Sequence, residues 1–574
     1  MKILVLSKQI PDVNRIEFDA STKRIRRNEV TLQTNPFDRR AVEAALQLKE
    51  REGGSAEVAT MGPPQAKAVL VEALRMGCDQ AYLISDQSYA GADTLITSSV
   101  LASFAKTGNY DIVLCGKYSL DGETSQVPGE IAAMLGFSFK SSVSAIGELT
   151  NGRLSVEQEH ENGFYSFLVP IPAVLSVGEK INRPRAPSLT IDEEKRINVL
   201  TEKQIMSGAV GSASPTVVES LERVESGRQV QFLQPGEEAY ALIASLMKKK
   251  RENSEKVTLP PPADVEIWGV ATAEDETPSE ISSKLALISR QTRMKVVMLG
   301  TPDPEKINGL HCHEYVRIEA EGNERIASAI TTLANSRHPA FIVFPSNTDG
   351  REIASLIAGK MKLGLTADCI DISMEDRQLV QFKPAFGGGV VARIISKTIP
   401  AMATVRPGIF RSIPGHEVGE LSRVGDTQPP RVVMEGFRPR PAEYMPLQHA
   451  AIIVGIGRGL KKREDVGRVI DFARAIGAAV GGTRPIVDYG FLPRQQQIGL
   501  TGISVSPALY IALGISGQDN HVVGIRYAEK VLAVNTNRSA PIFRYADYGL
   551  VMDMYQFMEE FASFIREGRK EAGQ

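Results

Sequence analysis

The chain has 574 residues, of which 43% are hydrophobic and 23% charged, and its formal net charge is −2 at pH 7. This composition is ordinary for a globular protein of roughly three or four domains. A nearly neutral charge balance gives no reason to expect a nucleic acid partner. No apolar run approaches the ~18 residues that a membrane helix needs, and residues 1–6 are too short for a signal peptide. We therefore expect a cytoplasmic protein without membrane insertion.

The cysteines and histidines give no sign of a metal centre. Four cysteines are spread along the chain without a CxxC pair, which argues against zinc and iron–sulfur sites. Cys115 ends an apolar run and is expected to be a small core residue. The run HCHE at residues 311–314 contains metal-ligand types, but neighbouring strand residues face opposite sides and cannot all reach one ion. Redox chemistry in this chain would therefore need an organic cofactor.

Short apolar runs alternate with amphipathic stretches along the first ~190 residues. We predict strands at residues 2–6, 57–61, 80–84 and 111–115, and helices at residues 39–50, 65–76, 94–105 and 129–135. Repeated strand–helix units predict a parallel sheet covered on both faces. In such sheets, ligands bind beyond the carboxyl ends of the strands.

Two further units of the same kind follow a polar stretch. Residues 248–256 and the prolines at 260–262 have the composition of a linker. A second strand–helix set begins at Val265, with strands predicted at 296–300 and 340–344 and a helix at 352–361. A third begins near Ala451 with a strand, a glycine-rich turn and a helix at 465–476. The sequence thus predicts three α/β units.

Two glycine-containing segments of the third unit are candidates for phosphate binding. Gly455, Gly457 and Gly459 follow a strand and leave room for a phosphate to approach the backbone, although a tight turn without ligand fits the pattern equally well. Ser516 and Gly517 follow a later apolar run, where a hydroxyl and main-chain N–H groups could meet a pyrophosphate.

Long stretches of the chain resemble electron transfer flavoproteins. Three stretches resemble the FAD-binding domain of the family's α subunit: residues 457–502, SPALYIALGISGQDNH and APIFRYADYGLVMDM. Its first domain resembles DGREIASLIAGKMKLGLTADC, KPAFGGGVVARI and MATVRPG. The β subunit resembles residues 1 to about 250, including KQIPD, NPFDRRAVEAALQLKE and GKYSLDGETSQVPGEIAAMLG. The chain is thus similar to a β and an α subunit fused in that order.

The resemblance implies an α/β fold of three domains with parallel-sheet, nucleotide-binding-like architecture. Two adenine-nucleotide-hydrolase-like domains would be followed by a C-terminal FAD-binding domain. We expect a β-subunit-like domain with a nucleotide site and a C-terminal arm at residues 1–250, a linker at 251–264, an α-subunit-like first domain at 265–440 and the FAD-binding domain at 441–574.

The family's FAD-lining positions carry over to matching residues of the last domain. They are Arg458, Thr483, Arg484, Thr501, Gly502, Ser516, Gly517, Asn520, His521, Asn535 and Asp547. By this resemblance, His521 faces the flavin C2 carbonyl, Thr501 bonds N5, and Arg484 lies over the ring and favours an anionic semiquinone. A lone histidine such as His521 is otherwise more often structural. The chain departs from the family in Thr483 for Ser, Leu500 for Gln and Asn520 for Gln, so the flavin potential is expected to differ.

A second nucleotide site is expected in the β-like half. The loop DGETSQVP precedes a helix, and a Ser or Thr at a helix start with Pro just inside it presents free N–H groups to a phosphate, although a capped helix without ligand fits as well. In the family this loop holds AMP or a second FAD together with positions that match Asn35, Gly62, Asp121, Thr124 and Gln126. The loop resembles that of members with a second FAD, which bifurcate electrons, so we favour FAD over AMP.

The expected function is electron transfer without catalytic residues of its own. The resemblance implies acyl-CoA dehydrogenase-like partners, as in fatty acid oxidation, and an acceptor such as a quinone oxidoreductase. If the chain bifurcates electrons, NADH is a further expected partner, with NADH-linked flavin oxidoreductase activity. Leu189, within NRPRAPSL, matches the leucine that anchors into a partner dehydrogenase. The alternatives are a one-FAD carrier with structural AMP and, from another class, an adenine-nucleotide sensor without redox activity.

Overall fold

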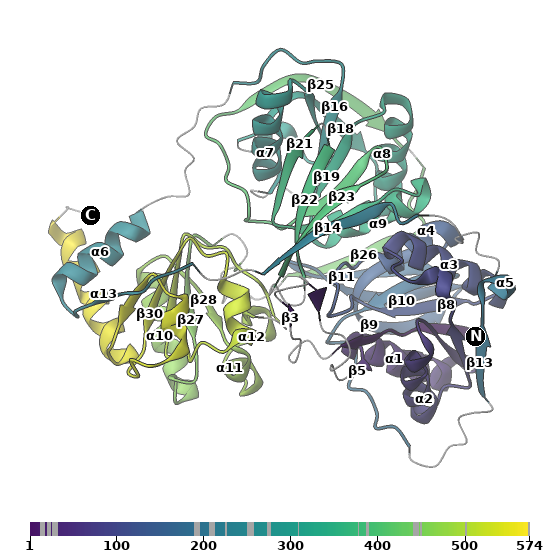
Figure 1. Ribbon diagram of the computed structural model, residues 1–574, viewed down its shortest axis with the longest axis horizontal. Helices are drawn as coiled ribbons and strands as arrows, with labels where there is room; N and C mark the ends of the chain where they lie inside the picture. The colour runs from purple at the N-terminus through teal and green to yellow at the C-terminus, as the bar shows by residue number, and fades with distance from the viewer. Residues whose placement is uncertain are drawn as a thin grey trace.

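The computed structural model describes residues 1–11, 18–19, 24–25, 32–188, 196–205, 213–223, 227–248, 258–272, 277–307, 309–376, 378–385, 390–426, 428–439, 447, 450–499 and 502–571. Three α/β units are visible in Figure 1, and each is built around one large sheet. The large sheets are wholly or mostly parallel. The predicted fold class, a three-domain α/β protein of parallel-sheet architecture, is confirmed.

The first unit contains a ten-stranded sheet in the order β13-β7-β6-β1-β8-β12-β9-β10-β11-β26. Its strands are β1 (Lys2–Leu6), β6 (Ser55–Met61), β7 (Gln80–Ile84), β8 (Ile112–Gly116), β9 (Ser138–Thr150), β10 (Arg153–Glu159), β11 (Gly163–Pro170), β12 (Ala173–Val177), β13 (Ile197–Leu200) and β26 (Val433–Pro439). Its helices include α1 (Pro36–Glu52), α2 (Lys67–Met76), α3 (Thr94–Gly108) and α4 (Val127–Leu135). The strands from β13 to β9 are parallel, so their carboxyl ends form one edge.

The second unit has a seven-stranded parallel sheet in the order β20-β24-β19-β16-β17-β18-β25. Its strands are β16 (Glu266–Ala271), β17 (Lys295–Gly300), β18 (His311–Glu319), β19 (Phe341–Pro345), β20 (Leu365–Cys369), β24 (Ala401–Val405) and β25 (Glu417–Gly425), and its helices are α7 (Thr277–Thr292), α8 (Asn323–Arg337) and α9 (Thr348–Met361). A four-stranded antiparallel sheet accompanies it, made of β14 (Thr216–Arg223), β21 (Asp371–Glu375), β22 (Gln378–Ala385) and β23 (Val390–Ser396).

The third unit has a six-stranded parallel sheet in the order β15-β31-β30-β29-β27-β28. Its strands are β15 (Gln231–Leu233), β27 (Ile452–Ile456), β28 (Ala479–Gly482), β29 (Leu509–Leu513), β30 (Lys530–Val534) and β31 (Tyr548–Leu550). Its helices are α6 (Glu237–Lys248), α10 (Val466–Ala475), α11 (Arg484–Asp488), α12 (Asp519–Val522) and α13 (Met554–Glu571).

Segments from each half of the chain complete sheets of the other half. β14 pairs with β23 in the second unit, and β15 pairs with β31 in the third. Helix α6 lies beside α13 at one end of the molecule (Figure 1), where the Tyr240 hydroxyl donates to Glu560 at 2.5 Å. In the opposite direction, β26 returns to the first sheet and pairs with β11. The expected arm of the β-like half is therefore an integral part of the other two units.

Small residues bring the first two units into direct helix-to-helix contact. A Cβ on Gly129 of α4 would lie 2.0 Å from the Ser355 hydroxyl of α9, and one on Gly359 of α9 would lie 2.6 Å from the Glu130 carbonyl oxygen. Buried apolar side chains of both units, such as Ile131 and Ile357, belong to one continuous hydrophobic cluster. The first and second units therefore share a core and form a single base.

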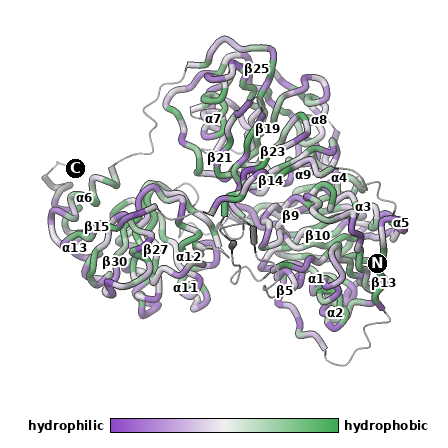
Figure 2. Tube along the Cα trace, viewed as in Figure 1, coloured by the Kyte–Doolittle hydropathy of each residue, from purple (hydrophilic) through white to green (hydrophobic). Residues whose placement is uncertain are grey.

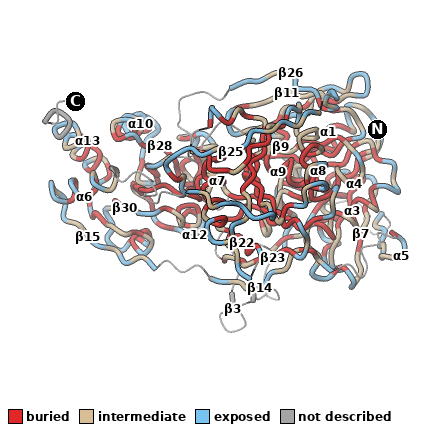
Figure 3. Tube along the Cα trace, turned by 90° about the horizontal axis from the view of Figure 1, so that it is seen from above, coloured by how far each residue is buried: buried red, intermediate tan, exposed pale blue. Residues whose placement is uncertain are grey.

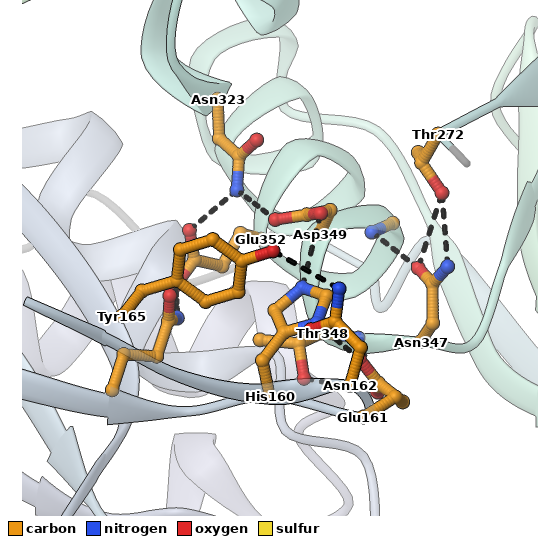
Figure 4. A network of polar contacts seen from close by, with 12 residues as sticks. His160, Glu161, Asn162, Tyr165, Thr272, Asn323, Asn347, Thr348, Asp349 and Glu352 are labelled. Carbon is orange, nitrogen blue, oxygen red and sulfur yellow. Dashed lines mark hydrogen bonds and ion pairs between the residues drawn. The ribbon is translucent and has the colours of Figure 1, made fainter. Parts of the chain in front are cut away.

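A buried polar network closes this interface beside the shared core (Figure 4). Glu352 of α9 accepts hydrogen bonds from the Lys140 ammonium at 3.0 Å, from the Ser141 amide at 2.7 Å and from the Gln158 amide group at 2.7 Å. Lys140 and Glu352 are buried. Nearby, His160 of the first unit contacts Asp349 of α9 at 3.1 Å. The network ties the two units together because the carboxylate that pairs with the buried Lys140 ammonium of the first unit belongs to Glu352 of the second.

Hydropathy and burial agree with the predicted pattern of elements. Apolar segments follow the central strands in Figure 2, and the buried parts of the chain run through the middle of the molecule in Figure 3, with β26 largely exposed. Helix α9 begins at Thr348, before the predicted residue 352, because the Asn347 side chain caps it by accepting from the Gly350 amide at 2.8 Å. Among the described helices, none combines the length and the apolar character required to cross a membrane.

Candidate functional site

A cleft of ≈ 440 Å³ opens at the carboxyl edge of the third unit's sheet. It is lined by residues that follow four parallel strands: Arg458 and Gly459 after β27, Gly514 and Ser516 after β29, Asn535 after β30 and Asp553 after β31. Its volume is within the range of sites for organic cofactors. Arg458 and Lys461 contribute positive charge, and Ser516 and Asn535 contribute neutral polar groups. This set suits a ligand that carries phosphate and ribose groups.

The glycines of this edge are required by close packing of the protein itself. A Cβ on Gly457 would lie 2.5 Å from the Gly514 carbonyl oxygen, and one on Gly455 would lie 1.7 Å from the Tyr510 hydroxyl. Gly517 has φ +88°, and a Cβ there would lie 2.1 Å from the Ile542 amide nitrogen. The glycine pattern thus brings the loops after β27 and β29 together, and this contact shapes the floor of the cleft.

The structure brings only part of the expected set into the cleft. Arg458, Ser516 and Asn535 line it, and the Asn535 side chain ties its walls together by donating to the Ile515 carbonyl oxygen at 2.9 Å. The remaining described candidates that follow β28 and β29 lie along the same sheet edge but outside the cleft lining: Thr483, Arg484, Gly502, Gly517, Asn520 and His521. Thr501 lies outside the described residues, as does Leu189.

Arg484 and His521 have contrasting surroundings. Arg484 is exposed and pairs with Asp488 one turn later in α11, at 3.2 Å. His521 is buried, and both of its ring nitrogens have protein partners: Nδ1 contacts the Ile498 carbonyl oxygen and Nε2 contacts the Tyr510 hydroxyl, each at 3.0 Å. Burial lowers the pKa of His521 to about 4, so the imidazole is neutral at physiological pH.

Asp547 lies at the opposite edge of the sheet from the cleft. It precedes β31, and its carboxylate accepts from the Val531 amide at 2.8 Å and pairs with Lys530 at 3.2 Å and with Arg228 of the arm. Asp553 follows β31 and lines the cleft, where its carboxylate also caps α13 by accepting from the Tyr555 amide at 2.8 Å. We therefore put Asp553 in place of Asp547 in the candidate site. Its position as the first charged residue after the apolar run 549–552 is the signal that could have found it.

These two aspartates are expected to respond differently to mutation. For the FAD that the sequence resemblance implies, Asp553→Asn should weaken binding, on the order of 10-fold for one lost charged hydrogen bond. Asp547→Asn should leave FAD affinity within about 2-fold and instead loosen the arm, because Arg228 loses its ion-pair partner. Isothermal titration of apoprotein with FAD measures the first effect, and proteolysis of the arm measures the second. The reverse pattern would return Asp547 to the site.

The expected nucleotide site of the first unit lies at the carboxyl edge of β1, β6 and β8. Asn35, buried immediately before α1, donates to the Tyr118 carbonyl oxygen at 2.9 Å. Asp121 pairs with Lys8 at 2.8 Å. Burial opposes its ionisation, but Lys8 together with hydrogen bonds from Ser119 and Gly122 holds the pKa of Asp121 below its ordinary value. Gly62 follows β6 at the same edge. The strand ends thus bring these separated residues to one place.

Buried polar atoms without a hydrogen-bond partner lie at this edge. Within the described residues, the Asn35 Oδ1, Ser7 Oγ and Thr60 Oγ1 atoms are buried without a hydrogen-bond partner. Buried polar groups are nearly always satisfied, so three such atoms around two neighbouring strand ends fit a polar ligand such as a nucleotide. Ser7 and Thr60 were not among the sequence candidates, although Ser7 directly follows a predicted strand.

The loop at residues 121–126 connects this edge to the second unit. Gln126 is buried; its Oε1 accepts from the Thr94 hydroxyl at 2.7 Å, and its Nε2 donates to the Leu365 carbonyl oxygen of the second unit at 3.0 Å. Its side chain is therefore used by the interface. Lys383 donates to the Gly122 carbonyl oxygen at 2.8 Å. Thr124 lies in the same loop, and α4 begins after it at Val127.

The chain matches two protein-family descriptions. The electron transfer flavoprotein domain matches residues 22–204 and 311–428, together more than half of the chain. The electron transfer flavoprotein FAD-binding domain matches residues 446–526, which include the loops after β27, β28 and β29. The chain belongs to the electron transfer flavoprotein family. It is an electron carrier of that family, and its third unit contains the FAD-binding domain.

Curated relatives include both subunits of such flavoproteins. A β subunit from Thermoanaerobacterium thermosaccharolyticum is 36% identical over 239 residues, which are 40% of this chain and 92% of that subunit. An α subunit from Clostridium acetobutylicum is 28% identical over 324 residues, which are 52% of this chain and 96% of that subunit. The subunit LctC of a lactate dehydrogenase (NAD(+),ferredoxin) from Acetobacterium woodii is 34% identical over 250 residues, 42% of this chain and 59% of LctC. One flavoprotein chain here matches both subunits, as the fused β–α resemblance predicted.

The cysteine and histidine residues of this flavoprotein have structural surroundings. All four cysteines are buried. His311 contacts the Ile413 carbonyl oxygen at 3.1 Å, whereas His313 accepts from the Val296 amide at 2.9 Å. In the part of the chain that the structure describes, no three potential ligands are gathered as a metal site.

Proposed function

We propose that this electron transfer flavoprotein carries electrons between dehydrogenases and an acceptor such as a quinone oxidoreductase, with FAD held at the carboxyl edge of the third sheet. The cleft described above is the observation that carries the placement. Arg458 and Lys461 would hold the pyrophosphate, and Asn535 and Asp553 would hold the ribose and its neighbouring hydroxyls. When bound, FAD supplies the electron-carrying isoalloxazine ring.

The polar edge of the first unit would hold a second nucleotide. Its unsatisfied atoms, at Asn35, Ser7 and Thr60, support a bound ligand of some kind. Three cations of the second unit favour FAD over AMP. They lie beside the loop at residues 121–126, where the flavin ring of an FAD bound to the first unit would extend toward the second. Lys383 bonds the Gly122 carbonyl oxygen at 2.8 Å, Arg351 approaches the Ser125 hydroxyl at 3.5 Å, and Arg406 pairs with Asp368 beside Arg351.

Cofactor counting tests the two proposed sites. Acid extraction of the purified protein, followed by separation and quantification of FAD and AMP, should give two FAD per chain. One FAD and one AMP per chain would leave the carrier function standing and replace the second FAD by AMP. A colourless protein that does not take up FAD would contradict the carrier function itself.

Electron bifurcation is the further proposal that a second FAD would permit. The similarity to LctC, a subunit of an enzyme whose name includes NAD(+) and ferredoxin, supports it. In that case NADH would donate electron pairs, and the two electrons of each pair would pass to two acceptors of different reduction potential. Stopped-flow absorbance after addition of NADH should show flavin reduction; no reduction by NADH would favour dehydrogenase donors, as in fatty acid oxidation.

Arg484→Ala should destabilise the anionic semiquinone of FAD. Arg484 is exposed and follows β28 at the carboxyl edge of the sheet that holds the cleft, so it can place positive charge near the ring. Spectroelectrochemical titration should show a smaller maximum of the anionic radical, by about 10-fold in its formation constant for one lost charge contact. Arg474→Ala, a change to an exposed arginine of α10, is the matched control. An unchanged titration for Arg484→Ala would remove its proposed role.

A further inference from the structure

A buried carboxylate joins the carboxyl ends of two neighbouring strands in the first unit. Asp38 lies in the first turn of α1 and is only 6% exposed. One of its oxygens accepts from the Lys8 amide, shortly after β1, at 2.8 Å, and the other accepts from the Gly116 amide, at the end of β8, at 3.0 Å. Position 116 has to be a glycine for this approach, because a Cβ there would lie 2.4 Å from the carboxylate. Asp38 therefore fixes how the chain leaves both strands.

The segments that Asp38 holds also carry the polar atoms left free at this edge. The Asn35 amide donates to the Lys8 carbonyl oxygen at 3.0 Å, so both main-chain groups of Lys8 are bound. Asn35 stands at the N-cap of α1, but its side chain does not cap the helix and instead donates to the Tyr118 carbonyl oxygen at 2.9 Å. In the described part of the chain, Asn35 Oδ1 thus has no hydrogen-bond partner, and neither has the Oγ atom of Ser7, directly before Lys8.

We propose that Asp38 is a positioning residue of the nucleotide site in the first unit, whose carboxylate holds the ends of β1 and β8 so that the free oxygens of Asn35 and Ser7 face the nucleotide. The inference rests on the proposed second nucleotide site and adds to it a residue that acts through the main chain. In Asp38→Asn, one acceptor oxygen becomes an NH2 group, which then faces a main-chain N–H. One strand end should therefore move, and nucleotide binding should weaken on the order of 10-fold for one lost charged hydrogen bond.

The titration of Asp38 separates positioning from simple stabilisation. Burial raises the pKa of Asp38 to about 7, against hydrogen bonds from Lys8, Asn35 and Gly116 that favour the ionised form. The Lys8 ammonium and the Cys115 thiol are the titratable groups that face it. Protonation would place an O–H group opposite one of the two main-chain donors, as the amide does in Asp38→Asn. Nucleotide affinity of the first unit should therefore fall below pH 7, by up to about tenfold per pH unit.

Asp111→Asn is the matched control for this experiment. Asp111 precedes β8 and accepts from the Lys2 amide at the start of β1 at 2.7 Å, so it joins the same two strands at their amino ends. A residue that only stabilises the sheet would affect nucleotide binding no more at position 38 than at position 111.

Calorimetric titration of the full-length proteins with FAD, and separately with AMP, measures the affinity of the first unit while the third unit stays loaded with FAD. Across a pH range that spans 7, we expect a falling affinity at acid pH in wild type and in Asp111→Asn, and a weak, flatter profile in Asp38→Asn. Comparison of the variants cancels any titration of the ligand itself.

Equal affinities for the Asp38→Asn and Asp111→Asn proteins, or the same pH profile in both, would overturn the role of Asp38. If Asp38→Asn does not fold, the wild-type profile decides, because an affinity that does not fall on the acid side of pH 7 also overturns it. A wild-type protein that binds neither FAD nor AMP in the first unit would instead count against the second nucleotide site itself.

Discussion

Gly517→Ala is expected to reduce FAD affinity on the order of 100-fold. The new Cβ would lie 2.1 Å from the Ile542 amide nitrogen. In addition, the backbone at position 517 has φ +88°, a left-handed conformation in which a residue with a side chain is strained. Overpacking of about 1–3 kcal/mol adds to left-handed strain of about 1–2 kcal/mol, and each ~1.4 kcal/mol is tenfold in affinity. The hydrogen bond from the Ile542 amide to the Ser516 carbonyl oxygen, 3.0 Å long, would break. The wall of the cleft around Ser516 would then be displaced.

Gly467→Ala provides the matched control for this experiment. Gly467 is an exposed residue of α10 in the same unit, and a Cβ there meets nothing within 4 Å. This change should leave FAD binding intact and add about 0.5–1 kcal/mol of helix stability. Fluorescence titration of apoprotein with FAD measures both variants. Equal affinities for the two variants would show that the contact between the loops does not shape the FAD site.

Glu352→Ala should lower the stability of the base by about 3–5 kcal/mol, because it leaves the buried Lys140 ammonium without its partner. Donors of Ser141, Gln158 and Asn323 would lose the same acceptor. Because the protein has several units, the loss should be seen in the urea transition of the base, measured by hydrogen exchange in β9 and α9. The FAD domain should keep its colour at urea concentrations that open the base.

Two further variants separate charge burial from simple loss of a glutamate. Glu321→Ala removes an exposed glutamate before α8 and should change stability by less than about 0.5 kcal/mol. The double replacement Lys140→Met with Glu352→Gln removes both charges and keeps an amide acceptor, so it should recover most of the loss. If Glu352→Ala proves as mild as Glu321→Ala, the network does not hold the two halves together.

Much of the fold follows from local patterns in the sequence. The predicted strand at residues 2–6 is β1, and the predicted helix at 94–105 lies within α3, which runs from Thr94 to Gly108. Apolar periodicity and helix-ending residues act within a few positions of each other, so a single sequence carries them. Motif resemblance likewise located the FAD-binding domain, because its glycine loops are contiguous in the chain. The division of the chain into domains at residues 250, 264 and 440 remains a proposal.

The candidate site was only partly accessible to sequence reasoning. Asp547 and Asp553 flank the same three-residue strand, and only the direction of that strand in the assembled sheet separates the cleft edge from the opposite edge. Similarly, nothing local indicates that Gln126 bonds the Leu365 carbonyl oxygen, 239 residues away. Such contacts depend on which strands pair and in which direction.

By itself, the sequence determined three α/β units, because hydrophobic periodicity, helix caps and glycine turns operate over short distances. Its resemblance to electron transfer flavoproteins located the FAD-binding domain in the last of them. The tertiary structure alone decided that β15 and α6 complete the third unit, that β26 returns to the first sheet, and that Tyr510 reaches His521. These contacts join residues far apart in the chain, so they stabilise the protein only once the units have packed together.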